Sequence, residues 1–217
     1  MNLGELRDKY RIKAGDKRKP YFWEDDEIDG YINEALYEAV DRGLMIYDRE
    51  SFVVSVEPDT TQYPLDKKII RVAEAFVTSK NGVALDRPLP LRLSDRKGDF
   101  TYQQYFDLQG YRISEDMIFI LATPPLDTFE VALVVHRYPN ALESDSDSPE
   151  IDDIYHDKML SWALKLGMLK QDADTVSEIT SDKWDAEFTR TFGPPKTAQQ
   201  HRQRKRRFAR TLKTPSF

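Results

Sequence analysis

The chain has 217 residues, no cysteine and a formal net charge of −6 at pH 7. Without cysteine it can form no disulfide, thiolate metal site or cysteine nucleophile, which fits a reducing compartment. The first residues are polar and charged, and no apolar run approaches the roughly 20 residues that span a bilayer, so we expect a protein made in the cytoplasm without a membrane segment.

The charge is distributed unevenly along the sequence. Residues 196–217 hold eight basic residues and no acid, whereas residues 1–195 hold 24 basic and 38 acidic residues, a net charge of −14. An acidic body with a basic C-terminal arm is therefore the strongest compositional signal, and it indicates a charged partner for the arm.

The N-terminal part, residues 1–50, is predicted to be helical. A short amphipathic helix is expected from about Leu3 to Ile12. In the longer helix that follows, Asp25 is the expected N-cap and Gly43 the expected end. The apolar residues of this helix recur at helical spacing and predict one buried stripe, made of Ile28, Ile32, Ala35, Leu36, Ala39 and Val40.

Residues 51–140 change to a period of two and are predicted to form a β lobe of short antiparallel strands. Asn81–Gly82 indicates a hairpin turn, and two later prolines place the next segment at a sheet edge or in a loop. Segment 68–78 is predicted to be a strand, although its alanine and glutamate content leaves a helix open. The clearest strand is 129–138, with Phe129, Val131, Leu133 and Val135 on one face.

Residues 141–195 return to helical periodicity after an acidic loop. One helix is expected to place Tyr155, Met159, Trp162, Ala163 and Leu166 on one face. Leu160, Leu164 and Met168 widen its apolar arc, so this helix is expected to pack on both sides. Another is expected from about Asp174 to Thr191, where Phe192–Pro195 ends it because proline cannot continue a helix. The N- and C-terminal helices should pack together, so the predicted fold class is α+β. It comprises a helical bundle with an inserted antiparallel β lobe and an extended C-terminal arm, residues 196–217.

No catalytic or metal-binding constellation stands out. The three histidines, His136, His156 and His201, have no metal-ligand spacing and are expected to be surface or partly buried structural residues. There is no nucleophile elbow, phosphate-binding glycine loop or dinucleotide fingerprint, so we expect no cofactor and no enzyme, although a carboxylate pair stays open.

The acidic loop contains six carboxylates, which would suit a hard cation. It lacks the glycine and the spaced terminal glutamate of a twelve-residue calcium loop, so we interpret it as a solvated linker that caps the following helix. Its acids are Glu143, Asp145, Asp147, Glu150, Asp152 and Asp153.

The basic arm supports two functional interpretations. It could neutralise the phosphates of a nucleic acid. It could also dock in an acidic protein groove, with Phe208, Leu212 and Phe217 as apolar anchors and arginine forks on carboxylates. A disordered solubilising tail is the alternative without a binding function. We favour protein docking, because the acidic body would repel a duplex that runs across it.

Several motifs occur in a characteristic order: WEDDEIDGYINEALYEAVDRG, then YPLDKKIIRV, then RYPNAL followed by SPEIDDIYHDKMLSWALKLGMLKQDADT. This order resembles the adaptor proteins of tailed bacteriophages, also called head-to-tail connector or head completion proteins. In that family a Pro–Glu–Ile step precedes a helix with an aromatic–His pair, here Tyr155–His156. A Trp-containing helix, here around Trp184, precedes a basic tail. The resemblance covers nearly the whole chain.

The resemblance implies a virion structural protein at the head-tail junction. Such proteins form a ring, commonly of twelve copies, beneath the portal, and the ring continues a channel through which DNA passes without specific binding. The implied partners are the portal ring, other copies of the chain, and tail or nozzle proteins. The expected portal contacts are Arg202, Arg204, Arg206, Arg207, Phe208, Arg210, Leu212 and Phe217. A nucleic-acid-binding protein and a cell-wall hydrolase remain the alternatives.

Overall fold

The computed structural model describes residues 1–93, 108, 110–114, 116–169, 178–197 and 200. Its elements divide between two compact units, a helical unit (residues 1–46 and 138–195) and a β unit (residues 47–137). Helices from both ends of the chain pack together and antiparallel sheets lie between them in sequence, which confirms the predicted α+β fold class. The C-terminal arm of that prediction lies largely outside the described residues.

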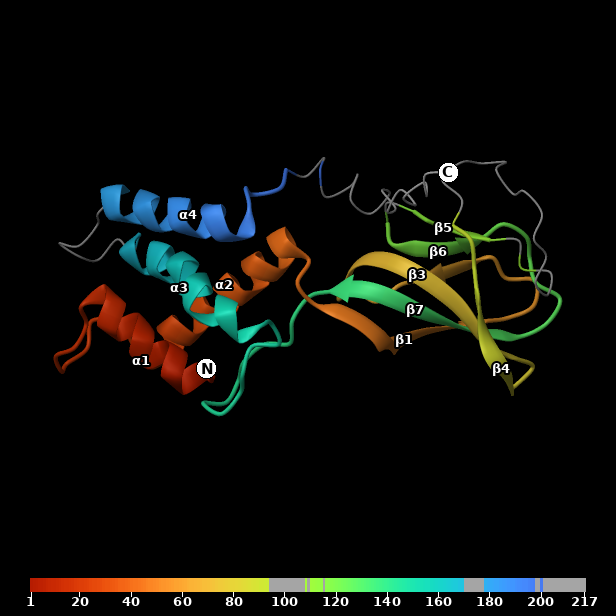
Figure 1. The fold of residues 1–217 in the computed structure, drawn as a ribbon, viewed down its shortest axis with the longest axis horizontal. Coiled ribbons are helices and arrows are strands. Elements are labelled where there is room, and N and C mark those ends of the chain that lie inside the picture. Colours follow the sequence, from red (N-terminus) through yellow and green to blue (C-terminus); the bar gives the residue numbers. More distant parts are fainter. Residues whose placement is uncertain (94–107, 109, 115, 170–177, 198–199, 201–217) are drawn as a thin grey trace, which may run out of the picture. The chain divides into compact units, whose positions relative to one another are not determined.

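The helical unit contains α1 (Leu3–Ala14), α2 (Asp25–Gly43), α3 (Asp153–Met168) and α4 (Glu178–Phe192). Helix α3 packs against α2 and α4, while α1 contacts α2 and α3 (Figure 1). This arrangement buries the stripe predicted on α2, because all six of its apolar residues are at most 1% exposed.

Helix α2 begins with a different cap from the one expected. The N-cap is Glu24, and the Glu27 carboxylate accepts a hydrogen bond from the Glu24 backbone N–H at 3.1 Å. Asp25 is the first helical residue instead, and its carboxylate accepts from Arg11. The prediction was wrong because Glu24, not Asp25, has a glutamate three residues later that can complete a capping box. Helix α2 ends at Gly43, as predicted.

Helix α3 is buried over the wide arc that the sequence predicted. Met159 and Ala163 are fully buried, and so are Leu160 and Leu164 on the adjoining side. His156 is only 1% exposed, deeper than the expected surface or partly buried position. Burial is tolerated because its Nε2 lies 3.0 Å from the Ile151 carbonyl oxygen. The expected start of the last helix at Asp174 lies outside the described residues.

The β unit contains two antiparallel sheets. The larger has the order β1-β7-β3-β4, and the smaller has the order β2-β6-β5. Segment 68–78 is therefore a strand, as predicted. The strands are β1 (Tyr47–Val56), β2 (Gln62–Pro64), β3 (Ile69–Lys80), β4 (Val83–Pro90), β5 (Tyr111–Ile113), β6 (Ile118–Leu121) and β7 (Phe129–Arg137).

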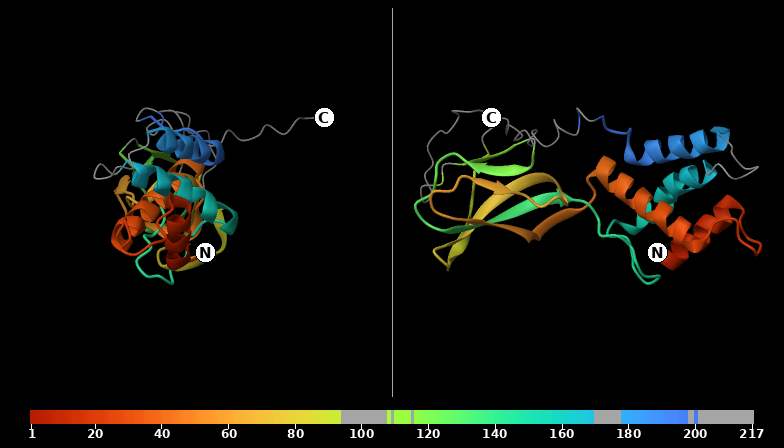
Figure 2. Two further views of the ribbon diagram at one scale, coloured as in Figure 1. Left: turned by 90° about the vertical axis from the view of Figure 1, so that its left-hand side faces the viewer. Right: turned by 180° about the vertical axis from the view of Figure 1, so that it is seen from behind.

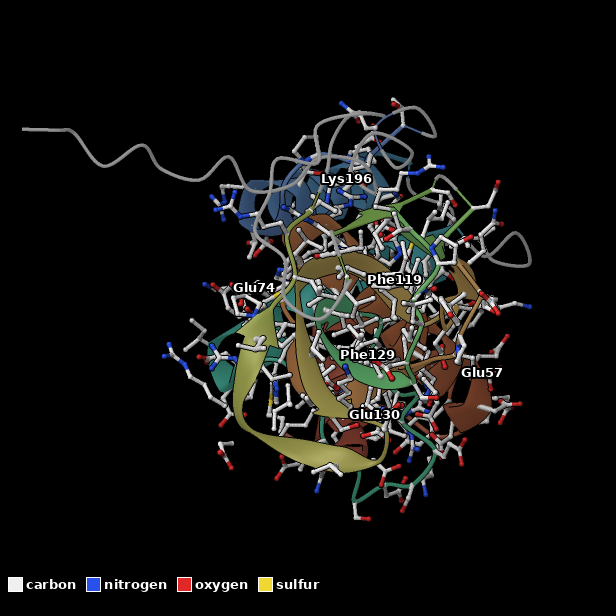
Figure 3. All side chains as sticks on the ribbon, turned by 90° about the vertical axis from the view of Figure 1, so that its right-hand side faces the viewer. Glu57, Glu74, Phe119, Phe129, Glu130 and Lys196 are labelled. Atoms are coloured by element: carbon white, nitrogen blue, oxygen red, sulfur yellow. The ribbon has the colours of Figure 1, made fainter. Side chains whose placement is uncertain are left out.

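The two sheets enclose an apolar core between them (Figures 1 and 2). The predicted inward face of β7 is confirmed, because Phe129, Val131, Leu133 and Val135 are at most 1% exposed. In Figure 3, Phe119 and Phe129 lie in the middle of the unit, and the exposed Glu57 and Glu74 lie at its margins.

The turn between β3 and β4 follows the predicted hairpin signal. Asn81 (φ 50°) and Gly82 (φ 77°) both take the left-handed conformation that a two-residue hairpin turn requires. Strand β4 lies at the edge of its sheet, where its two prolines remove no central ladder bond.

Candidate docking site at the root of the C-terminal arm

The eight residues predicted to contact the portal all lie outside the described residues. The structure describes instead the place where the arm leaves the helical unit. Helix α4 ends at Phe192, Gly193 follows with a φ of 90°, and Pro194–Pro195 prevents further helix, as the sequence predicted.

The arm root is held by a buried arginine on α2. The Arg42 side chain is 1% exposed. Its Nη1 donates to the Gly193 carbonyl oxygen at 3.0 Å and to the Thr189 hydroxyl at 3.2 Å. Its Nε donates to the Glu38 carboxylate at 2.7 Å, one helical turn earlier. One guanidinium therefore donates hydrogen bonds both to α2 and to the end of α4. A lysine ammonium lacks the planar fork of donors that these contacts use.

Aromatic rings surround the Arg42 guanidinium. Its central carbon lies 4.7 Å from the Trp162 ring centroid and 5.0 Å from that of Phe188. Phe188 in turn packs on Phe192, with ring centroids 4.5 Å apart. A cation over aromatic faces is attracted by the ring quadrupoles, and this attraction strengthens when water is excluded. The same guanidinium thus links α2, α3 and α4.

A second ion pair holds α4 against α3 farther from the arm. The Lys165 ammonium lies 2.7 Å from the Asp185 carboxylate and 3.8 Å from the Trp162 ring centroid. Asp185 is 40% exposed, so this pair contributes less than the buried Arg42 contacts do. The arm therefore leaves from a helix whose last turn is fixed more firmly than its middle.

Arg42 was not predicted to be a site residue. The available signal was the basic residue at the end of an apolar stripe, four residues after Glu38. That spacing also fits an exposed i, i+4 ion pair, which is common on helix surfaces. Only the position of α4, far away in sequence, distinguishes the two possibilities.

The described residues offer no group of three metal-ligating side chains. In the acidic loop, Asp147 accepts hydrogen bonds from the backbone N–H groups of Glu143 and Ser144, and Asp152 accepts one from Ile154 at the start of α3. These carboxylates are thus occupied with loop and helix backbone. No helix in the described part of the chain is long and apolar enough to span a membrane.

Comparison with known proteins places the whole chain in one family. The model of a family described as SU10 adaptor protein matches residues 1–214. No curated protein matches the sequence.

Proposed function

The chain belongs to the SU10 adaptor protein family, and on that premise we propose that it joins the capsid portal to the tail of a phage particle. In this role, copies of the chain form a ring at the head-tail junction and continue the DNA channel. The C-terminal arm docks on the portal, and the β unit faces tail or nozzle proteins. The role is structural, and DNA passes without specific binding.

The separation of charge carries this proposal. The helical unit has 24 acidic and 13 basic residues, a net charge of −11, and the arm that leaves it has eight basic residues and no acid. An arm with this charge is attracted by an acidic groove on a partner and repelled by a basic one. Its five arginines can each make paired hydrogen bonds to carboxylates, and its three apolar residues can fill pockets.

The fixed arm root supports the same role. Because Arg42 holds Thr189 and Gly193, the direction in which the chain leaves α4 is set by packed side chains. Ordering a free arm on a partner costs conformational entropy. A ring of copies on a ring of portal subunits offsets that cost, because each bound arm raises the effective concentration of its neighbours.

Deletion of residues 196–217 tests the proposal. We expect the truncated chain to fold, with unchanged tryptophan fluorescence, and to lose its association with isolated portal rings in a sedimentation assay. Two matched variants separate charge from fork geometry. Replacing the five arm arginines by lysine should weaken the association, and replacing them by glutamine should abolish it.

Continued binding of the truncated chain to portal rings would contradict the proposal. A salt series with a random DNA duplex tests the nucleic-acid alternative. Under that alternative, the logarithm of the binding constant would fall steeply with salt for the intact chain, and this dependence would disappear with the arm.

A further inference from the structure

The connection between α1 and α2 is a braced projection. Asp16, which is 8% exposed, accepts hydrogen bonds from the backbone N–H groups of Phe22 at 3.0 Å and Trp23 at 3.4 Å. The Arg11 guanidinium donates to the same carboxylate at 2.6 Å. Trp23 is 3% exposed and packs edge-on against Tyr10, with ring centroids 5.7 Å apart. The loop Lys17–Phe22 is therefore closed at its base by buried contacts.

This loop presents cations and aromatic rings to solvent. Lys17, Arg18 and Lys19 are exposed, and none of them forms an ion pair with the residues that the structure describes. Tyr21 is 38% exposed and Phe22 39% exposed. Exposed tyrosine, phenylalanine and arginine on a preorganised loop are the residue types that anchor protein–protein contacts.

The opposite end of α1 carries the complementary chemistry. There the backbone N–H groups of Leu3 and Gly4 donate to the carbonyl oxygens of Asp147 and Asp145, which seats the acidic loop on the first turn of the helix. Ile154 is 61% exposed, and five exposed acids lie on this loop and at the start of α3: Glu143, Asp145, Glu150, Asp152 and Asp153. Two of them contact the α1 end, because Asp145 lies 2.8 Å from Arg7 and Asp153 lies 3.7 Å from the N-terminal ammonium. Helix α1 has 12 residues, so the two surfaces are separated by about 18 Å of helix.

A nucleic acid is the less suitable occupant of the basic loop. Beyond the buried Trp23, the exposed acids Glu24, Asp25 and Asp26 form the N-cap and the first turn of α2. These carboxylates would repel a continuous run of phosphates, whereas a protein surface can pair with charges of both signs. Two different, complementary surfaces at opposite ends of one unit are what a head-to-tail contact between identical copies requires.

We propose that the loop Lys17–Phe22 of one copy docks on the acidic surface Glu143–Ile154 of the next copy. Lysine and arginine pair with the carboxylates, and Tyr21 and Phe22 cover Ile154. The contact is heterologous, so each copy uses its loop on one neighbour and its acidic surface on the other. This inference rests on the proposed function, because it names the surfaces by which assembled copies meet.

The absence of cysteine from the sequence makes a thiol cross-linking test specific. Phage particles are assembled with a chain that carries Arg18→Cys and Glu143→Cys, and a short bismaleimide is added. We expect a ladder of cross-linked oligomers on a denaturing gel, several-fold stronger than with either single variant. The matched control pairs Arg18→Cys with Asp182→Cys, because Asp182 is also an exposed acid but lies on α4.

The outcomes separate this inference from the proposed function. Cross-linking of the Arg18/Glu143 chain no stronger than that of the Arg18/Asp182 control, in particles that contain the chain, would overturn the inference alone. Absence of the chain from purified particles would overturn the proposed function and the inference with it.

Charge reversal gives an independent readout. The triple variant Lys17→Glu, Arg18→Glu, Lys19→Glu should assemble poorly, and so should a chain with Glu143 and Asp153 changed to lysine. Assembly should recover when both variant chains are supplied together, because each reversed surface then meets a surface of opposite charge. Recovery would support the contact. Its failure, together with loss of duplex DNA binding in the loop variant, would assign the loop to nucleic acid and overturn the inference.

Discussion

The helical unit and the β unit are stabilised by different kinds of contact. The helical unit has a net charge of −11 and buries Arg11, Asp16, Arg42 and His156, each at most 8% exposed. The β unit, residues 47–137, has 14 acidic and 11 basic residues, a net charge of −3, and its core cluster is apolar. Specific polar pairs thus position the first unit, and buried apolar area dominates the second.

The two units can be followed separately in the intact chain. All three tryptophans, Trp23, Trp162 and Trp184, lie in the helical unit. Tryptophan fluorescence therefore reports on that unit, and hydrogen-exchange mass spectrometry reports on both. A substitution in one unit therefore leaves the other unit as an internal reference.

The largest effects are expected from a matched pair of core substitutions. Phe188→Ala in α4 and Phe129→Ala in β7 each empty a site at most 1% exposed, which costs about 3–5 kcal/mol of unfolding free energy. Phe188→Ala should lower the fluorescence-detected denaturation midpoint and increase exchange around Arg42. Phe129→Ala should leave that midpoint in place and increase exchange in the β strands.

A fluorescence midpoint that moves equally in both variants would show that the two units unfold together, and it would contradict their separate stabilisation. Phe188→Leu and Phe129→Leu serve as controls, because they keep most of the buried volume and should cost clearly less.

Gly167→Ala in α3 is expected to destabilise the helical unit, against the usual helix preference for alanine. Alanine would normally gain up to about 1 kcal/mol within a helix. Here the added Cβ would overlap the buried Tyr10 hydroxyl and lie 3.1 Å from its ring carbon Cζ. Because Tyr10 is fully buried, it cannot swing away, and we expect a net loss of about 1–3 kcal/mol in chemical denaturation.

Tyr10→Phe provides the control for this clash. The Tyr10 hydroxyl is buried and has no hydrogen-bond partner in the described structure, so its removal alone should cost little. In the double variant it should recover part of the loss caused by Gly167→Ala. Strictly additive effects of the two substitutions would show that the clash with Tyr10 is not the cause.

Local patterns in the sequence predicted most of the fold, and contacts between distant segments account for the errors. The stripe on α2, the inward face of β7 and the Asn81–Gly82 turn each depend on neighbours in the chain. The Glu24 cap was missed because two adjacent acids compete for one position. Arg42 and Gly167 were missed because their roles come from helices more than a hundred residues away. The predicted arm contacts remain predictions, since those residues lie outside the described structure.

Asp48 in the β unit, whose side chain is 9% exposed, should make the stability of that unit depend on acid. Burial raises the pKa of Asp48, but hydrogen bonds from Ser51, Arg137 and Glu50 outweigh this effect and hold the pKa well below its usual range. A depressed pKa stabilises the folded state above the unfolded-state value of about 4, and this stabilisation is lost as the pH falls through the folded pKa.

Asp48→Asn should therefore cost about 1–3 kcal/mol at neutral pH and flatten the acid dependence of exchange in β1 and β7. Asp127→Asn, which affects a more exposed ion pair with Lys80 in the same unit, should cost less than about 1 kcal/mol. Equal losses from the two variants at neutral pH would contradict the role assigned to burial at Asp48.

The smallest effects are expected from substitutions of two exposed tyrosines, Tyr37 in the helical unit and Tyr47 in the β unit. Tyr37 stacks on Tyr138 in the helical unit, with ring centroids 4.2 Å apart and planes within 8°. In the β unit, Tyr47 meets His136 at 5.2 Å with a tilt of 54°. Tyr37→Leu keeps apolar bulk but removes the stacked ring, so it should cost about 0.5–1.5 kcal/mol.

Tyr47→Leu should cost less than Tyr37→Leu, because its ring is tilted and more distant from its partner. Only Tyr37→Leu should shift the tryptophan midpoint. Tyr138 is the first residue of the helical unit after the β unit in the sequence. Its stacking on Tyr37 of α2 therefore fixes the point at which the chain re-enters the helical unit. A shift for Tyr47→Leu instead would mean that strand β1 sets that return point, and the helical unit would then depend on the β unit more than its own contacts indicate.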